Sequence, residues 1–222
     1  MAGARQVAGG GRAVEVAPGR LAGWFTRFAD RNDGVRTTEL GPAEVRVTAA
    51  NGATATATVP FGPLADTGVR TGLAVEPLVA HALASRVIAV LLVRLGGHSL
   101  GLARDGVVGL SRTDRHLVPG RTAAGGWSQQ RFARRRAGQA RTALRAAADE
   151  AFEVLVPRLS EVDAVVLGGD RRALDRLRAD RRLGPLFARA EPRVLEIPGP
   201  RRAVLDEAAR RAIAVQVVVR EA

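Results

Sequence analysis

The stretch of the sequence with the clearest chemical potential covers residues 125–130 and reads Gly-Gly-Trp-Ser-Gln-Gln. Gly125 and Gly126 can adopt positive φ angles and allow a close approach to another backbone. Gln129 and Gln130 carry amides that donate and accept hydrogen bonds but are not useful general bases. Such a residue can orient a water molecule, or it can hold its backbone N–H against a developing oxyanion. The pattern predicts a loop tip that enters an RNA site where much of the electrostatic environment already exists.

The two residues between the glycines and the glutamines have more than one interpretation. Trp127 can stack on a base or a sugar, or it can pin the loop onto the protein. Ser128 is expected to cap the N-terminus of the helix that follows. A serine-hydrolase role for Ser128 is disfavoured, because Ser128 does not stand in a Gly-x-Ser-x-Gly elbow.

Arginines dominate the segment behind this stretch. Seven arginines and no acidic residue occur from Arg121 to Ala148. A helical projection at about 100° per residue predicts an apolar face made of Phe132, Ala137, Ala140, Leu144, Ala147, Ala151 and Leu155. The opposite face, the arginine face of this predicted helix, consists of Arg131, Arg134, Arg135, Arg141 and Arg145. Like charges on one helix face repel each other, and a solvent-exposed helix normally alternates both signs. A face with arginines alone therefore predicts a surface that binds phosphates. The alternative is an arginine-rich surface produced by coding bias.

The composition excludes several classes of site. The chain has 222 residues and a net charge of +12, from 34 basic residues that are all arginine against 22 acidic ones. Without cysteine or lysine there is no thiol nucleophile, disulfide, thiolate metal site, Schiff base or Walker-type phosphate loop. The three histidines, His81, His98 and His116, lack metal-ligand spacing, so no metal and no cofactor are expected. The excess of positive charge favours a polyanionic partner, with nucleic acid ahead of a membrane surface.

The N-terminal residues lack the apolar core of a signal peptide. The longest apolar run, Val87–Val93, is too short to cross a bilayer. We therefore expect a cytoplasmic protein that does not bind membranes.

The second half of the chain shows a regular order of elements. Three strands joined by tight turns precede a polar loop over 112–126 and a long helix over 128–157. Further strands are expected at 164–167, 193–197 and 213–219, and further helices at 171–181 and 201–211. Asp163, Asp170 and the pair Gly168-Gly169 are expected to serve in turns and caps. This order predicts an α/β fold with a mixed sheet (α+β) covered by helices.

The first 86 residues are harder to assign. A strand at 13–17, an amphipathic helix at 18–31 and a hairpin around Asn51-Gly52 are expected, followed by turns over 62–72 and a short helix over 75–86. We expect a flexible N-terminus at 1–12, an N-terminal α/β extension or subdomain at 13–86 and a catalytic domain at 87–222. An RNase H-like nuclease is disfavoured, because the first core strand, Val87–Leu95, carries no metal-binding carboxylate.

The run from Gly125 to Arg136, Gly-Gly-Trp-Ser-Gln-Gln-Arg-Phe-Ala-Arg-Arg-Arg, resembles the catalytic loop of the release-factor-like peptidyl-tRNA hydrolases. That family is related to the middle domain of archaeal and eukaryotic class I release factors, whose loop carries Gly-Gly-Gln. The branch most similar to this sequence is the actinobacterial type, akin to the tRNA-cleaving domain of eukaryotic ribosome quality control. The resemblance implies an RNase H-like, release-factor middle-domain-like core over about Val87–Val219. Trp127 and Ser128 interrupt the strict motif, so Gln129 becomes the matching glutamine and Gln130 its alternative.

The resemblance implies a peptidyl-tRNA hydrolase that releases nascent chains from stalled 50S complexes as a ribosome rescue factor. Gln129 would position the attacking water, while Gly125 and Gly126 would permit the loop conformation. Arg121 and the arginine face of the predicted helix would hold the tRNA acceptor end or the RNA of the large ribosomal subunit, with the protein acting as a monomer. Two alternatives stay open: removal of the tRNA 3′ CCA end, and a non-catalytic factor that binds RNA or the ribosome.

Overall fold

A computed structural model describes residues 5–7, 10–94, 96–115 and 127–222 of the chain. Inside the long helix that begins at Trp127, the side chains are described from Gly138 onward. The described chain forms two compact units. The first unit combines Met1–Ser85 with Ile213–Ala222, and the second unit comprises Arg86–Ala212.

The first unit is built on a seven-stranded antiparallel sheet with the strand order β1-β2-β12-β5-β4-β3-β6. Alternation of buried valines with exposed polar residues, as in β4, gives this sheet one apolar face. The helices α1 (Leu21–Asp30) and α2 (Glu76–Leu83) add apolar side chains to the same core, and the 3₁₀ helix η1 (Pro18–Arg20) leads into α1. The strands are β1 (Arg5–Gln6), β2 (Arg12–Val16), β3 (Val35–Leu40), β4 (Glu44–Ala49), β5 (Thr54–Thr58), β6 (Gly68–Thr71) and β12 (Val215–Arg220).

The hairpin predicted around Asn51-Gly52 is confirmed, because β4 and β5 pair in register on either side of it. Gly52 has a φ of 96°, and the Asn51 side chain accepts a hydrogen bond from the Ala53 N–H at 3.0 Å. Three strands of this sheet were not predicted from the sequence. Two of them are β3, and β6 inside the stretch predicted as turns. Arg5–Gln6, within the stretch expected to be flexible, forms β1 against β2.

The second unit contains a five-stranded mixed sheet with the order β11-β10-β7-β8-β9. The first three strands along the chain form an antiparallel meander, whereas β10 runs parallel to both β7 and β11. The α/β class with a mixed sheet, predicted from the sequence, is therefore confirmed. The strands are β7 (Val87–Arg94), β8 (Gly97–Arg104), β9 (Val107–Arg115), β10 (Ala164–Gly169) and β11 (Ala190–Leu195).

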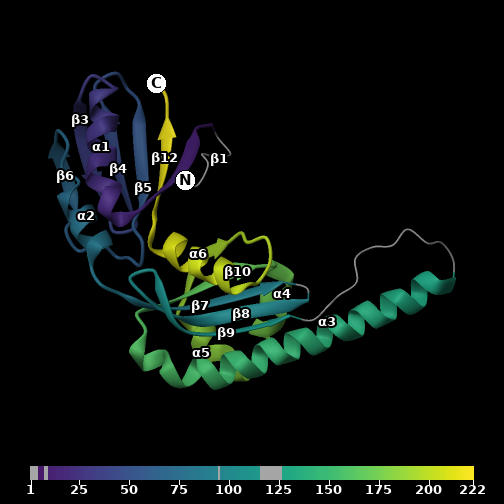
Figure 1. Ribbon diagram of the computed structural model, residues 1–222. Helices are drawn as coiled ribbons and strands as arrows, with labels where there is room; N and C mark the ends of the chain where they lie inside the picture. The colour runs from purple at the N-terminus through teal and green to yellow at the C-terminus, as the bar shows by residue number, and fades with distance from the viewer. Residues whose placement is uncertain (1–4, 8–9, 95, 116–126) are drawn as a thin grey trace. The chain divides into compact units, whose positions relative to one another are not determined.

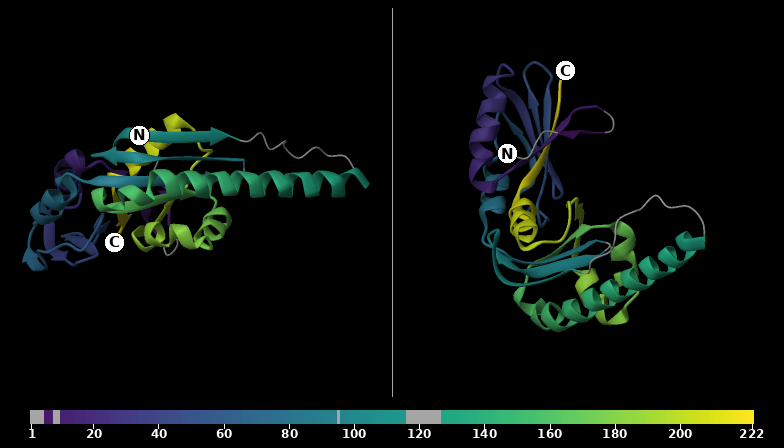
Figure 2. Two further views of the ribbon diagram at one scale, coloured as in Figure 1. Left: turned by 90° about the horizontal axis from the view of Figure 1, so that it is seen from below. Right: turned by 45° about the vertical axis from the view of Figure 1, so that its right-hand side comes forward.

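Helices cover both faces of this sheet (Figures 1 and 2). One face packs in a single apolar cluster with α3, α4, α5 and the 3₁₀ helices η2 and η3. The opposite face carries α6, which donates hydrogen bonds from Arg202 to Ser111 and to the Val108 carbonyl of β9. The helices are α3 (Trp127–Val154), η2 (Val156–Glu161), α4 (Arg171–Arg178), η3 (Arg181–Leu183), α5 (Gly184–Ala188) and α6 (Arg202–Ile213).

The predicted cap role is confirmed for Asp170, whereas Asp163 makes a hydrogen bond to a distant strand. The Asp170 side chain caps α4 by accepting a hydrogen bond from the Arg172 N–H at 2.9 Å. The Asp163 carboxylate accepts one from the Val87 N–H at 2.8 Å, at the start of β7. Gly169 has a φ of 108° and its Cα faces the Val93 carbonyl, so this tight strand-to-helix connection requires glycine.

Several element boundaries and one strand pairing differ from the prediction. β9 continues to Arg115, four residues beyond its predicted end at Ser111, because its pairing with β8 extends to Gly97. β11 begins at Ala190 instead of Arg193. The last strand, β12, pairs with β2 and β5 of the first unit, although the sequence grouped it with residues 87–212.

Candidate functional site

The candidate site is carried by α3, whose 28 residues correspond to a length of about 42 Å at about 1.5 Å per residue. The C-terminal half of α3 packs on the five-stranded sheet, and the N-terminal half extends past the edge of that sheet (Figures 1 and 2). Ala140 is the first of the described α3 side chains to be buried. Gln129 precedes it by eleven residues, or about 16 Å of helix.

The C-terminal half of α3 is held to the sheet by its alanines. Ala140, Ala147 and Ala151 of the predicted apolar face are buried, as is Leu155 just beyond the helix. Leu144 packs partly buried against the same cluster. The predicted face is confirmed for these five residues, whereas the side chains of Phe132 and Ala137 lie outside the described residues.

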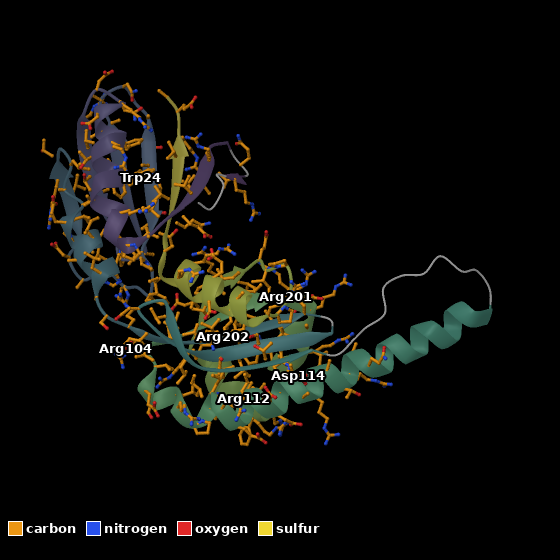
Figure 3. All side chains as sticks on the ribbon, viewed as in Figure 1. Trp24, Arg104, Arg112, Asp114, Arg201 and Arg202 are labelled. Carbon is orange, nitrogen blue, oxygen red and sulfur yellow. The ribbon has the colours of Figure 1, made fainter. Side chains whose placement is uncertain are left out.

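A polar contact also fixes α3 to the sheet. His98 of β8 is fully buried and its Nε2 lies 2.9 Å from Glu150 Oε2 of α3. The other ring nitrogen, Nδ1, has no hydrogen-bond partner within the described part of the chain. Because β8 and β9 are in register, Asp114 lies opposite His98 and Arg112 opposite Leu100, on the sheet face that α3 covers (Figure 3). The His98–Glu150 contact restricts the rotation of α3 about its axis relative to the strands.

The sequence did not single out this anchor, although a signal for it exists. His98 stands two residues before Leu100, which is buried beneath α3, so both side chains lie on the same face of the strand. A histidine at such a position predicts a polar partner in the covering helix. The identity of that partner, 52 residues away, depends on the tertiary fold.

The predicted tip residues lie at the far end of α3 or just before it. Trp127, Ser128, Gln129 and Gln130 form the first turn of α3, and their side chains lie outside the described residues. The helix begins one residue earlier than predicted, so Ser128 lies inside this turn, and its expected place as the N-cap is wrong. Gly125, Gly126 and Arg121 fall outside the described residues.

Two members of the predicted arginine face, which we call the α3 arginine face, have described side chains. Arg141 and Arg145 are exposed, as the helical projection predicts, and the Arg145 side chain is 86% exposed. Arg145 Nε lies 3.9 Å from Asp149 Oδ2, so their ion pair is loose. Arg131, Arg134 and Arg135 belong to α3, with side chains outside the described residues.

The charge order along α3 opposes the helix dipole. Negative residues stabilise the N-terminal turn of a helix and positive residues its C-terminal turn. In α3 the first turn holds no acidic residue and the last turn no basic one. The arginines precede residue 146, and the acidic residues Asp149, Glu150 and Glu153 follow it. The positive end of the dipole and the arginines therefore act in the same direction, and together they favour an anionic partner at the N-terminal half of α3.

Other kinds of site receive no support from the described residues. No cluster of three or more histidine and acidic side chains there is arranged to hold a metal ion. None of the helices in the described ranges is both long enough and apolar enough to cross a membrane.

Several solved structures resemble this chain, and three of them are distant from it in sequence. An archaeal protein is 16% identical over 73% of this chain and 48% of its own, with a TM-score of 0.39, so this chain spans about half of it. The archaeal translation termination factor aRF1 is 13% identical over 89% of this chain and 70% of its own, with a TM-score of 0.45. Pelota from Archaeoglobus fulgidus is 13% identical over 95% of this chain and 65% of its own, with a TM-score of 0.34.

No curated protein matches the chain. A family model does match, over residues 86–218, which is more than half of the sequence and includes the whole of α3. The family is described as the Actinobacteria/chloroflexi VLRF1 release factor. The resemblance first noted in the glutamine stretch is thus confirmed at the level of the family: this chain belongs to the Actinobacteria/chloroflexi VLRF1 release factors.

Proposed function

We propose that this protein hydrolyses the ester bond of peptidyl-tRNA on the large ribosomal subunit and so releases nascent chains from stalled complexes. Membership of a release-factor family supports a role in translation termination or ribosome rescue. The observation that carries the finer proposal is the stretch Gly-Gly-Trp-Ser-Gln-Gln, whose last four residues form the start of α3. We expect such a factor to act as a monomer in the cytoplasm.

The shape of α3 supports a site that acts inside another molecule. An α-helix with its side chains is about 10–12 Å wide, and the N-terminal half of α3 projects past the sheet (Figure 1). The buried alanines and the His98–Glu150 contact hold the other half in place. The helix is therefore a narrow arm on a fixed base, suited to carrying Gln129 into a confined RNA site.

The helix start also suits the chemistry of ester hydrolysis. The backbone N–H groups of the first helical turn have no partner inside the helix. With α3 beginning at Trp127, this group of donors includes the N–H of Gln129. Such donors stabilise the negative charge that develops on the carbonyl oxygen when water attacks an ester.

In the proposed reaction Gln129 orients the water that adds to the carbonyl carbon of the peptidyl ester. The tetrahedral intermediate then breaks its bond to the tRNA 3′ oxygen. That oxygen leaves with a proton, and the peptide leaves as a carboxylic acid. The glutamine amide stays chemically unchanged, because it orients the water without taking its proton. Intact tRNA and free peptide are the two products.

The arginines are proposed to supply affinity. Arg121 and the α3 arginine face would contact phosphates of the tRNA acceptor end or of ribosomal RNA, with a strength that falls as salt rises. Replacing Arg141 and Arg145 by glutamate should weaken binding to 50S subunits. It should also make the slope of log affinity against log salt shallower by roughly 1–2. An unchanged slope would show that these two exposed side chains do not contact phosphates.

The reaction is tested by incubating the protein with purified 50S subunits that carry labelled peptidyl-tRNA. We expect free peptide together with tRNA of unchanged length on a sequencing gel. A tRNA shortened at its 3′ end would instead show removal of the CCA end. Binding to the subunits without either product would identify a non-catalytic ribosome-binding factor.

A further inference from the structure

A second group of exposed arginines lies outside α3, on α4 and η3. We call it the α4–η3 surface, and its members are Arg171, Arg172, Arg176, Arg178, Arg181 and Arg182. The apolar side of α4, formed by Ala173, Leu174 and Leu177, is buried under this surface. Six arginines against three aspartates over residues 170–182 leave the segment with a charge of 6 − 3 = +3.

Most of the acidic groups in this segment are already engaged by the backbone. Asp170 caps α4 and accepts the Arg172 N–H, and Asp180 caps η3 and accepts the Arg182 N–H at 3.0 Å. The Asp180 carboxylate also accepts hydrogen bonds from the Arg182 side chain, and these bonds lower its pKa.

Five arginines of the α4–η3 surface have no acidic partner among the described residues: Arg171, Arg172, Arg176, Arg178 and Arg181. Arg178 instead lies over the Phe187 ring, 5.0 Å from its centre. Arg172 and Arg176 stand at i and i+4, where like charges destabilise a helix by a few tenths of a kcal/mol. Arg171 and Arg172 also occupy the first turn of α4, the end where positive charge opposes the helix dipole. The surface is thus electrostatically unfavourable for α4 itself.

Abundance of arginine does not by itself produce this situation. On α6, Arg202 pairs with Asp206 at 3.0 Å and Arg210 pairs with Glu207 at 2.8 Å. The remaining arginine of that helix, Arg211, donates a hydrogen bond to the Glu196 carbonyl. Both acids of α6 form ion pairs with arginines one turn away, whereas near α4 two of the three acids, Asp170 and Asp180, serve as caps. The third, Asp175, lies one turn from Arg171 and forms no ion pair with it among the described residues.

The α4–η3 surface is continuous with the α3 arginine face. Asp149 of α3 accepts a hydrogen bond from Arg182 Nη2 at 2.8 Å and lies 3.9 Å from Arg145 Nε. The Arg182 guanidinium also lies 5.3 Å from the ring centre of Phe152, an aromatic side chain that is 39% exposed. Arg145, Asp149 and Arg182 thus link the two sets of arginines across one side of the second unit.

We infer that the α4–η3 surface binds the phosphate backbone of RNA and extends the contact made by the α3 arginine face. A repeating anionic polymer matches several fixed cations that no acid neutralises, and arginine pairs with phosphate in a bidentate geometry. The choice of RNA as the polymer rests on the proposed function. The role differs from that of α3, because the α4–η3 surface adds affinity at the base of the arm and takes no part in the reaction.

The test compares the full-length wild type with a variant carrying Arg171→Glu, Arg172→Glu and Arg176→Glu. The probes are fluorescently labelled deacylated tRNA, protein-free ribosomal RNA and purified 50S subunits, each titrated over a range of salt concentrations. We expect affinity for all three to fall at least about tenfold at low salt, with a slope of log affinity against log salt shallower by roughly 2–3.

A matched control reverses Arg20, Arg27 and Arg31, three exposed arginines of the first unit, and so changes the net charge by the same amount. An equal loss in the control, or wild-type affinity in the α4 variant, overturns the proposal. Weaker binding to 50S with unchanged binding to both protein-free RNAs also overturns it, because the partner would then be an acidic protein surface.

Two further measurements keep the result interpretable. A variant with glutamine at positions 171, 172 and 176 removes the charges without reversing them, and thermal unfolding of each variant shows whether it still folds. A stable glutamine variant that binds RNA with wild-type affinity counts against the proposal. Release of peptide from 50S–peptidyl-tRNA is followed in parallel with the wild type. Absence of that activity would refute the proposed function while the RNA affinities of the variants still decide this inference.

Discussion

Replacing Glu150 by alanine tests whether the His98–Glu150 contact fixes the base of α3. His98 is fully buried, and Glu150 is the one hydrogen-bond partner of its ring within the described part of the chain. Without Glu150 both ring nitrogens are left unpaired in the interior, which costs about 1–3 kcal/mol. Alanine has the higher helix propensity, which offsets a few tenths of a kcal/mol of that loss.

Glu153→Ala is the matched control, because Glu153 is exposed on the same helix and the substitution is identical. Equilibrium urea unfolding followed by far-UV circular dichroism gives the free energy of unfolding of each variant. We expect Glu150→Ala to be less stable than the control by about 1–3 kcal/mol. Equal stabilities would refute the view that the contact anchors α3.

A double-mutant cycle sharpens this test. In the His98→Leu background, Glu150→Ala no longer leaves a buried ring unpaired. Its effect on the free energy of unfolding should therefore fall below about 1 kcal/mol. The difference between the two costs measures the coupling of the pair. An equal cost in both backgrounds would attribute the effect of Glu150 to other contacts of its side chain.

Two other parts of the second unit give predictions that unfolding experiments can check. Gly169→Ala should lower the free energy of unfolding by about 2–4 kcal/mol, because a Cβ at this positive-φ position meets the Val93 carbonyl. Gly138→Ala in α3, where the space around the glycine is open, should raise it by about 0.5–1 kcal/mol. Similar effects of the two changes would contradict the geometry. Burial raises the pKa of Glu191, and Arg86 only partly opposes this rise. The folded state therefore binds the Glu191 proton more tightly than the unfolded state, and stability is lost as pH rises through the raised pKa. Glu191→Gln should be more stable than the wild type at neutral pH, with the gain shrinking on acidification, and a gain that persists in acid would count against this cause.

The parts of the fold that the sequence predicted well are those with strong local signals. The periodicity of alanines and leucines predicts α3 to within a few residues. The apolar run that forms β7 and the Asn-Gly pair between β4 and β5 are similarly local. Each of these signals arises within one element and its neighbour, so no tertiary information is needed to read it.

The missed elements depend on distant partners. β3 reads Val-Arg-Thr-Thr-Glu-Leu, with little apolar alternation, and it is held as a strand by β4 and β6 on its two sides. β6 is a four-residue edge strand whose Val69 is 74% exposed. β12 has a clear strand sequence, yet its place beside β2 and β5 depends on a pairing across about the whole chain.

In the candidate site, too, local features were predicted from the sequence and contacts between distant residues were not. The glutamine stretch and the exposure of Arg141 and Arg145 follow from residue types and helical spacing. The contacts that hold α3, from His98 and from Arg182, join residues 52 and 33 positions apart and become visible only in the fold. The functional motif is thus local in sequence, whereas the base that positions it is not.

The most direct test of the central claim is single-turnover peptide release from 50S–peptidyl-tRNA by the wild type, Gln129→Ala and Gln130→Ala. The proposal predicts that Gln129→Ala abolishes release of peptide while its affinity for the subunit and its thermal stability stay at wild-type values. Gln130→Ala should retain release. Full release by Gln129→Ala would contradict the claim that this glutamine positions the attacking water, and loss confined to Gln130→Ala would transfer that role to the neighbouring residue.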